Sequence, residues 1–278
     1  MSVYAYQLLK GLGFSEQRTL ALLPAIKVDT LLPNQFIFRR GAPPQAWFHV
    51  VTGLVCGSIP GQGRNVTPMH IFGPGSWFGE VPILNHGRFL VDGVCLTPVR
   101  MLSLSMAQFY DAFENEPEFS RHIARLVSWR IQQHAEMLIV ARLGSPQLRV
   151  ALGLAIFAEA LHTSNSHLPA GELDDSLKIP LKQSLLASLC GVSRGLFSDC
   201  VQQLSAAGWV SLNYATLELT REAVWRKFCS QYRQNRLNIV KPSMQEILSL
   251  LDAASSDAPA PSPIGEWRAR DRRQADHF

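Results

Sequence analysis

The spacing of apolar positions changes along the chain, and each spacing predicts a different kind of element. Between residues 41 and 93, short apolar runs alternate with turn residues, and this stretch holds ten of the 19 glycines. Short strands broken by turns at this spacing are typical of an antiparallel barrel or sandwich. We therefore expect a β-barrel over residues 29–113, preceded by N-terminal helices over residues 1–28.

A heptad-like spacing then predicts one long helix within residues 114–143. At about 1.5 Å per residue, a helix from Pro117 to Leu143 is about 40 Å long, which exceeds an ordinary packing helix. Two interpretations remain open: a long core helix of one domain, or a helix that forms a dimer and connects two domains. The expected dimer interface has steps of three and four residues and consists of Ile123, Val127, Ile131, His134, Leu138 and Ala141.

Residues 144–222 carry the most specific pattern, two helices joined by a glycine turn and followed by a hairpin. A short amphipathic helix ends before Gly191, and Ser193 is a suitable N-cap for the second helix. Two short apolar runs then flank a turn at residues 213–215. This order predicts a winged helix-turn-helix domain that binds DNA. The alternative is a small helical hairpin without a ligand.

The last part of the chain is expected to form a basic helical extension over residues 223–252 and a disordered tail over residues 253–278. Thr220 is a suitable cap for the first helix of the extension. Arg226 and Lys227 would lie away from the apolar face of that helix and contact DNA phosphates. The alternative is a solvated basic face on a packing helix.

Composition and charge narrow the class of protein. The chain of 278 residues is 47% hydrophobic and 17% charged, which excludes a wholly disordered chain. Its net charge of +4 is mild, but residues 222–241 contain five basic residues and one acidic residue, which equals the whole excess. No apolar run approaches the roughly 20 residues of a membrane-spanning helix. Five widely spaced cysteines favour a reducing cytoplasm over zinc fingers or a disulfide framework.

Catalytic motifs are missing from the sequence. It contains no H-E-x-x-H, no phosphate loop and no dinucleotide fingerprint after a strand. The eight histidines do not cluster at the spacing of metal ligands. We therefore expect neither an enzyme nor a metal site.

Four features occur in the order of a known family. They are the first barrel strands, a glycine-bearing loop, the long helix, and the turn that starts the second helix of the pair; the loop reads Gly75-Ser76-Trp77-Phe78-Gly79-Glu80 and the turn Leu189-Cys190-Gly191-Val192-Ser193-Arg194. Over roughly residues 31–220 the chain resembles the Crp/Fnr superfamily of bacterial transcription regulators. The resemblance implies an α+β fold with a jelly-roll barrel of the cyclic-nucleotide-binding type, a dimerisation helix and a C-terminal winged helix-turn-helix.

The resemblance also implies an effector site in the barrel, with one departure. In relatives that bind cyclic nucleotides, an Arg-Ser or Arg-Thr pair follows the Gly-Glu motif and neutralises the phosphate, whereas this chain has Leu90 and Val91 there. Without that charge nothing offsets the desolvation of a phosphate, so we do not expect ordinary cyclic AMP binding. The candidate effector site is Gly79, Glu80, Arg88, His70 and His134, although both histidines could instead be core or interface residues. The chain has no cysteine before Cys56, so we expect no iron–sulfur cluster.

The resemblance places the second helix of the pair in the major groove of double-stranded DNA, as part of a homodimer on a near-palindromic operator. Glu and Arg of the usual recognition set are replaced by Gly195 and Asp199, so we expect an unusual half-site. Two rivals stay open: a regulator without an effector or under a partner's control, and an interaction module that has lost DNA binding. RNA polymerase and a small-molecule effector are further candidate partners. The candidate DNA contacts of the helix are Ser193, Arg194, Gly195, Ser198, Asp199 and Gln202.

Overall fold

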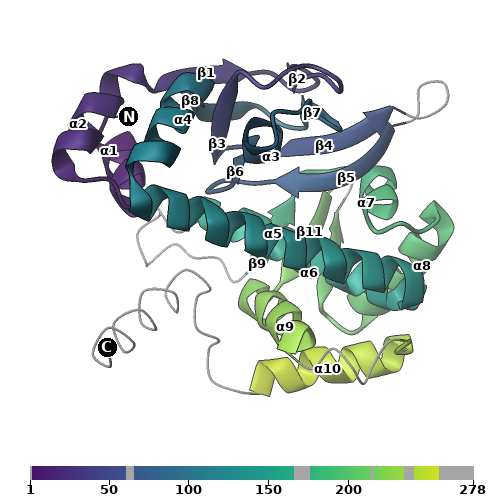
Figure 1. Ribbon diagram of the computed structural model, residues 1–278. Coiled ribbons are helices and arrows are strands. Elements are labelled where there is room, and N and C mark those ends of the chain that lie inside the picture. Colours follow the sequence, from purple (N-terminus) through teal and green to yellow (C-terminus); the bar gives the residue numbers. More distant parts are fainter. Residues whose placement is uncertain (1, 61–65, 166–175, 214–215, 235–240, 257–278) are drawn as a thin grey trace.

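The computed structural model shows a β-sandwich above a mostly helical C-terminal half, with one long helix running along both (Figure 1). It describes residues 2–60, 66–165, 176–213, 216–234 and 241–256. The α+β fold expected from the sequence is confirmed. Most of the expected C-terminal tail lies outside the described residues.

The N-terminal segment forms α1 (Ser2–Gly11), α2 (Glu16–Leu22) and a 3-10 turn (Leu23–Ala25). The Ser15 hydroxyl caps α2 by accepting a hydrogen bond from the Arg18 amide at 3.2 Å.

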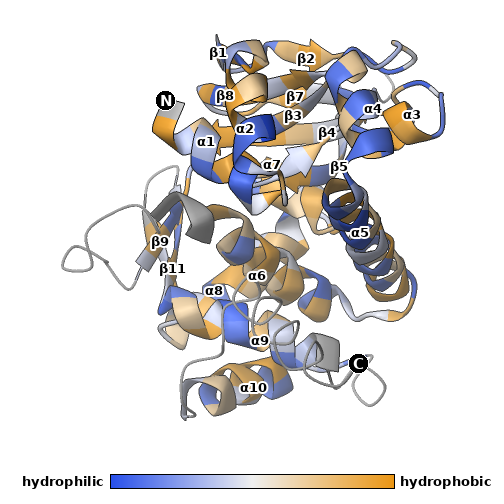
Figure 2. Cartoon of the chain, turned by 60° about the vertical axis from the view of Figure 1, so that its left-hand side comes forward, coloured by the Kyte–Doolittle hydropathy of each residue, from blue (hydrophilic) through white to orange (hydrophobic). Residues whose placement is uncertain are grey.

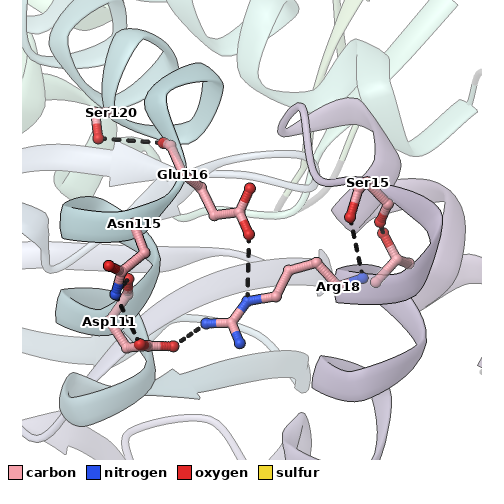
Figure 3. A network of polar contacts seen from close by, with 7 residues as sticks. Ser15, Arg18, Asp111, Asn115, Glu116 and Ser120 are labelled. Carbon is pink, nitrogen blue, oxygen red and sulfur yellow. Dashed lines mark hydrogen bonds and ion pairs between the residues drawn. The ribbon is translucent and has the colours of Figure 1, made fainter.

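The guanidinium of Arg18 ties α2 to the rest of the molecule (Figure 3). It pairs with Asp111 and lies 3.7 Å from the Glu116 carboxylate. Asp111 lies in the C-terminal half of helix α4 (Met106–Asn115), and Glu116 is the C-cap of that helix. Asn115 supports Asp111 by donating to its carboxylate at 3.0 Å. The N-terminal helices are therefore fixed to the barrel side of the molecule.

The barrel consists of two four-stranded antiparallel sheets, with strand orders β1-β8-β3-β6 and β2-β7-β4-β5. Aromatic rings from both sheets meet between them: Phe72 lies 4.7 Å from Phe78, and Phe38 lies 6.1 Å from Phe48. Phe89, in the segment before β7, stacks on Phe38 with ring centroids 3.7 Å apart. The strands are β1 (Lys27–Leu31), β2 (Phe36–Phe38), β3 (Ala46–Thr52), β4 (Val55–Pro60), β5 (Val66–Phe72), β6 (Trp77–Phe78), β7 (Asp92–Cys95) and β8 (Val99–Ser105).

Three helices interrupt or follow these strands: α3 (Glu80–Leu84), α4 (Met106–Asn115) and α5 (Pro117–Leu143). Ser105 and Gln108 form a capping box at the start of α4. The predicted long helix is confirmed, because α5 spans Pro117–Leu143. Its first turns bury Phe119 and Ile123 against the N-terminal helices and α4.

The described residues of the C-terminal half share one hydrophobic core built around α6. The strand order of its three-stranded sheet is β10-β11-β9. Its elements are α6 (Pro146–Asn165), β9 (Ser176–Ile179), α7 (Gln183–Leu189), α8 (Arg194–Ala206), β10 (Val210–Asn213), β11 (Thr216–Thr220), α9 (Glu222–Gln234) and α10 (Met244–Ser256).

The last two helices belong to this core instead of extending away from it. Helix α9 packs on α6, and α10 packs on α9, α6 and α8, as the lower part of Figure 2 shows. Met244, Ile247 and Leu251 of α10 are buried there. Residues 253–256 form the last turn of α10, so the expected disorder of residues 253–278 is wrong for these four residues.

The two halves meet at the edge strand β5. Helix α7 packs against β5, and Ile71 and Leu54 of the barrel join the C-terminal core. Gly73 follows β5 and lies so close to α6 that a Cβ atom there would be 2.1 Å from the Ala160 carbonyl oxygen. The barrel and the C-terminal half therefore share buried surface.

Burial of α10 leads to a prediction about stability. Replacement of Leu251 by alanine removes a fully buried side chain, so the free energy of unfolding should fall by about 2–5 kcal/mol. Asp252→Ala, on the exposed side of the same helix, should change it by less than about 0.5 kcal/mol. Urea denaturation of the two variants compares them; an equal effect would contradict the packing of α10.

Candidate functional site

Helices α7 and α8 are joined by a tight turn that a left-handed glycine and two hydrogen bonds hold in place. Gly191 has φ +63°, a left-handed conformation that favours glycine. The Ser193 hydroxyl caps α8 by accepting a hydrogen bond from the Leu196 amide at 3.3 Å, as predicted. Arg149 of α6 donates to the Gly191 carbonyl at 2.9 Å. The start of α8 is thus anchored to the core helix α6.

Helix α8 has a buried face and a polar outward face. Phe197, Cys200, Val201 and Leu204 are buried in the C-terminal core, as the sequence pattern predicts. The opposite face carries short polar side chains, one arginine and one glycine. The structure brings the six candidate residues together on this side, with all but the half-buried Ser198 exposed: Ser193, Arg194, Gly195, Ser198, Asp199 and Gln202.

The predicted hairpin follows α8, and β9 and α9 both contact it. Strands β10 and β11 pair antiparallel, with Val210 opposite Leu219, and β9 pairs with β11 as a third strand. The Trp225 indole of α9 donates to the Trp209 carbonyl at 3.3 Å, and the Arg221 guanidinium lies 5.0 Å from the Trp209 ring. The hairpin is thereby fixed relative to α9.

The start of α9 differs from the expectation. The Thr220 hydroxyl does not cap the helix and donates to the Gly208 carbonyl at 2.6 Å. Arg226 forms an ion pair with Glu222 at 2.7 Å, and Lys227 is only 7% exposed. The prediction that Lys227 lies on an outward face is therefore wrong, because α6 and α10 cover two sides of α9.

A second group of candidate residues surrounds Glu80 at the start of α3. Gly79 has φ +100°, a left-handed conformation that lets the chain turn directly from β6 into α3. The Glu80 carboxylate is 0% exposed, accepts a hydrogen bond from the Trp47 indole at 3.3 Å and pairs with the Arg130 guanidinium. Trp47 in turn stacks on Trp77 with ring centroids 3.7 Å apart.

Arg130 of α5, like Trp47, belongs to this site and was not predicted from the sequence. Besides pairing with Glu80, it donates to the Trp77 carbonyl at 2.6 Å. Its signal in the sequence is the spacing of three residues from Val127 and four to His134, which puts all three on one side of a helix.

Two of the candidate histidines lie beside this arginine. The rings of His70 in β5 and His134 in α5 are 5.6 Å apart, and the His70 ring is 4.5 Å from Phe72. Burial, together with the charges of Arg130 and His134, lowers the pKa of His70 to about 3. His70 is therefore a neutral ring at physiological pH. Arg130 thus lies next to all three predicted residues Glu80, His70 and His134.

Arg88 has a different environment from these residues. Its side chain is exposed, and its Nη1 atom donates to the Gly41 carbonyl at 2.8 Å. Leu90, at the position expected for a phosphate-binding arginine, is 77% exposed. The polar contacts shown for Glu80 come from Trp47 and Arg130 instead.

The outward face of α5 differs in part from the expected dimer interface. Ile123 is 1% exposed and lies in the core of its own protomer, so its assignment to an interface is wrong. Val127 is half-buried and packs against the same core. Ile131 and Leu138, at 65% and 56% exposed, do lie outward, as does Ala141.

Exposed small and apolar residues continue this outward face with heptad-like steps of four and three. The face is therefore rotated slightly from the expected set, away from the barrel. We call the following residues the α5 stripe: Ala124, Ser128, Ile131, Ala135 and Leu138.

Membrane-spanning and metal-binding features are both missing from the described residues. Among these helices, none combines the length and hydrophobicity needed to cross a membrane. No three His, Cys, Asp or Glu side chains of the described part are grouped to hold a metal ion. All five cysteines are free and buried.

The sequence of the barrel is similar to that of known proteins. Residues 28–116 match the model of the cyclic nucleotide-binding domain. The chain is 24% identical over 189 residues to the cyclic AMP receptor protein of Thermus thermophilus, a match that covers 68% of this chain and 81% of that protein.

Solved structures extend the likeness beyond the barrel. FixK2 from Bradyrhizobium japonicum is 13% identical with a TM-score of 0.59, and covers 78% of this chain and 98% of its own. A CRP/FNR-family transcriptional regulator from Thermus thermophilus is 17% identical with a TM-score of 0.56, over 73% and 98%. The c-di-GMP-responsive global regulator CLP of Xanthomonas campestris is 17% identical with a TM-score of 0.54, over 74% and 99%.

These matches confirm the resemblance inferred from the sequence. Residues 28–116 are similar to the cyclic nucleotide-binding domain, and the chain is similar in sequence to the cyclic AMP receptor protein of Thermus thermophilus and has the fold of the CRP/FNR transcription regulators.

Proposed function

We propose that this protein is a transcriptional regulator that binds a near-palindromic DNA operator as a homodimer. The observation that carries the proposal is the outward polar face of α8, which follows the α7 turn and precedes the β10–β11 hairpin. A helix of this kind, with a capped and exposed N-terminal turn, fits the major groove of DNA. In this proposal residues 29–113 are the sensor barrel and residues 144–222 read DNA.

The side chains of α8 support an unusual target sequence. Arg194 is exposed at the first turn, where a guanidinium can donate two hydrogen bonds to one guanine. Gly195 has open space around it, so the helix presents backbone where a longer side chain would otherwise reach a base. The exposed Asp199 carboxylate repels phosphates and can accept from a cytosine amino group.

The α5 stripe supports the homodimer. Its isoleucine and leucine are more than half exposed, and its other residues are two alanines and a serine, which allow two helices to approach closely. An exposed apolar stripe with heptad spacing is typical of a helix that pairs with a copy of itself. Two-fold pairing would place two α8 helices over half-sites about one helical turn apart, ~34 Å.

The surroundings of Glu80 argue against control by ordinary cyclic AMP. Its carboxylate is already engaged by Arg130 and Trp47, and Leu90 and Val91 offer no charge to a cyclic phosphate. The free, buried cysteines suit a reducing compartment, and we place the protein in the cytoplasm. RNA polymerase is a candidate partner if the regulator is an activator.

The proposed function first predicts sequence-specific DNA binding. Wild-type protein should enrich a near-palindromic sequence from a random double-stranded DNA library. Arg194→Ala should weaken binding to the enriched operator by about 10-fold to 100-fold, because it removes a bidentate base contact. Arg39→Ala removes the same charge from the exposed barrel surface and should change affinity less than twofold. If no sequence is enriched and Arg194→Ala alters no transcript, the interaction-module alternative replaces this proposal.

The second prediction concerns assembly. Leu138→Glu puts a charge into the α5 stripe, so the protein should sediment as a monomer at concentrations where the wild type is a dimer. Val3→Glu is the matched control, because Val3 is an exposed apolar residue on α1, and it should remain dimeric. A Leu138→Glu protein that stays dimeric would exclude the α5 stripe as the interface.

The third prediction concerns the effector. Calorimetric titration with 1 mM cyclic AMP, a concentration of about 1,000 times a micromolar Kd, should give no saturable heat. Cyclic di-GMP serves as a second ligand in the same titration, since CLP of Xanthomonas campestris is responsive to it. Micromolar cyclic AMP binding that Glu80→Gln abolishes would show that an added nucleotide can displace Arg130.

A further inference from the structure

Arg130 connects helix α5 to two different points of the barrel. One nitrogen of its guanidinium pairs with the Glu80 carboxylate at the start of α3, and another donates to the Trp77 carbonyl in β6 at 2.6 Å. The arginine side chain is 12% exposed and the glutamate side chain is fully buried. The contact therefore joins residues 50 positions apart in the sequence and excludes water from the carboxylate.

The chemistry of this contact fixes where α5 lies on the barrel. A buried carboxylate is costly to leave without a partner, so removal of either charge is much more destabilising than an exposed ion pair would suggest. The planar guanidinium serves two acceptors at once, which restricts both the position and the rotation of α5. Any added ligand that uses the Glu80 carboxylate must first break this pair.

Strand β5 lies between that contact and the helix pair α7–α8. On its inner side, the Phe72 ring lies 5.7 Å from the Arg130 guanidinium and His70 meets His134. Ile71, between them in sequence, packs into the C-terminal core, and α7 packs against the same strand. Strand β5 therefore contacts Arg130 and His134 of α5 through His70 and Phe72, and it also contacts α7, the helix that precedes α8.

We propose that the Arg130–Glu80 pair is an internal latch that takes the place of a small-molecule effector. The guanidinium of the chain itself occupies the Glu80 carboxylate, holds α5 on the barrel and, through β5, fixes the position of α7 and hence of α8. The protein then binds its operator without any added ligand. This inference rests on the proposed DNA-binding function and specifies how that function is regulated.

A double-mutant cycle on the operator selected by the wild-type protein tests the latch. With no ligand added, Arg130→Gln and Glu80→Gln should each lower the affinity for the operator at least tenfold. The affinity of the double variant should not be lower than that of the single variant that binds more weakly. Arg130→Lys, which keeps the charge but not the two-acceptor geometry, should also lose at least fivefold. Wild-type affinity should stay unchanged in the presence of cyclic AMP or cyclic di-GMP.

The matched control is Arg121→Gln on the same helix. Arg121 pairs with Glu118, but both side chains are more than half exposed, so this pair contributes little. Its removal should change operator affinity less than twofold. Sedimentation of every variant separates loss of the latch from loss of the dimer, since the latch variants should remain dimeric.

Hydrogen exchange supplies a readout that does not need DNA. Amides of β5 and α7 should exchange faster in Arg130→Gln and Arg130→Lys, while amides of α10 should not change. A folded, dimeric Arg130 variant that binds the operator within twofold of the wild type overturns the latch. So does wild-type protein that binds DNA only after a small ligand is added, although the proposed DNA-binding function then stands.

Failure of the proposed function has a different signature. If the wild type binds no DNA, that function is wrong, and exchange in β5 and α7 alone decides whether Arg130 holds α7. Unchanged exchange in both Arg130 variants would overturn the latch in that case as well.

Discussion

A carboxylate with no access to water is the constraint around which the sensor half is arranged. Glu80 is fully buried at the start of α3, so its charge must be met inside the protein. Trp47 of β3 and Arg130 of α5 both contact it, so two elements distant in the sequence supply its partners. The left-handed Gly79 aims the glutamate inward, and the stacked Trp47 and Trp77 rings close the site.

Contacts beyond Glu80 join the two halves of the molecule on either side of the long helix. Arg130 fixes the middle of α5 on the barrel, and α6 turns back so that Ala160 lies against Gly73. Leu54 and Ile71 then enter the core that surrounds α6. A hinge at residues 144–146 therefore has less freedom than a linker of the same length between independent domains.

Local patterns in the sequence predicted the elements well. The heptad-like spacing predicted α5, the Ser193 cap and the Gly191 turn predicted the start of α8, and paired apolar runs predicted the β10–β11 hairpin. These features depend on backbone geometry within a few residues, so composition and spacing carry the information. The barrel was recognised from glycine spacing and motif order, although its strand pairing was not predicted.

Errors arose where burial depends on distant segments. The spacing of α5 places Ile123 and Ile131 in one seam, but the N-terminal helices and α4 cover Ile123 and leave Ile131 exposed. Similarly, α10 packs beside α9 and Lys227 is buried, which helical periodicity within α9 does not reveal. Arg130 was missed because its partner lies 50 residues away, beyond the range of any local pattern.

Gly195 has a consequence for how a protein of this kind can change its target. It lies in the first turn of α8, exposed, and a side chain added there would touch nothing within 4 Å. Glycine is about 1 kcal/mol less favourable than alanine within a helix, so most replacements at this position cost the fold nothing. The outward face of α8 thus holds an open position at which new base contacts can arise by single substitutions, while the buried side of the helix stays as it is.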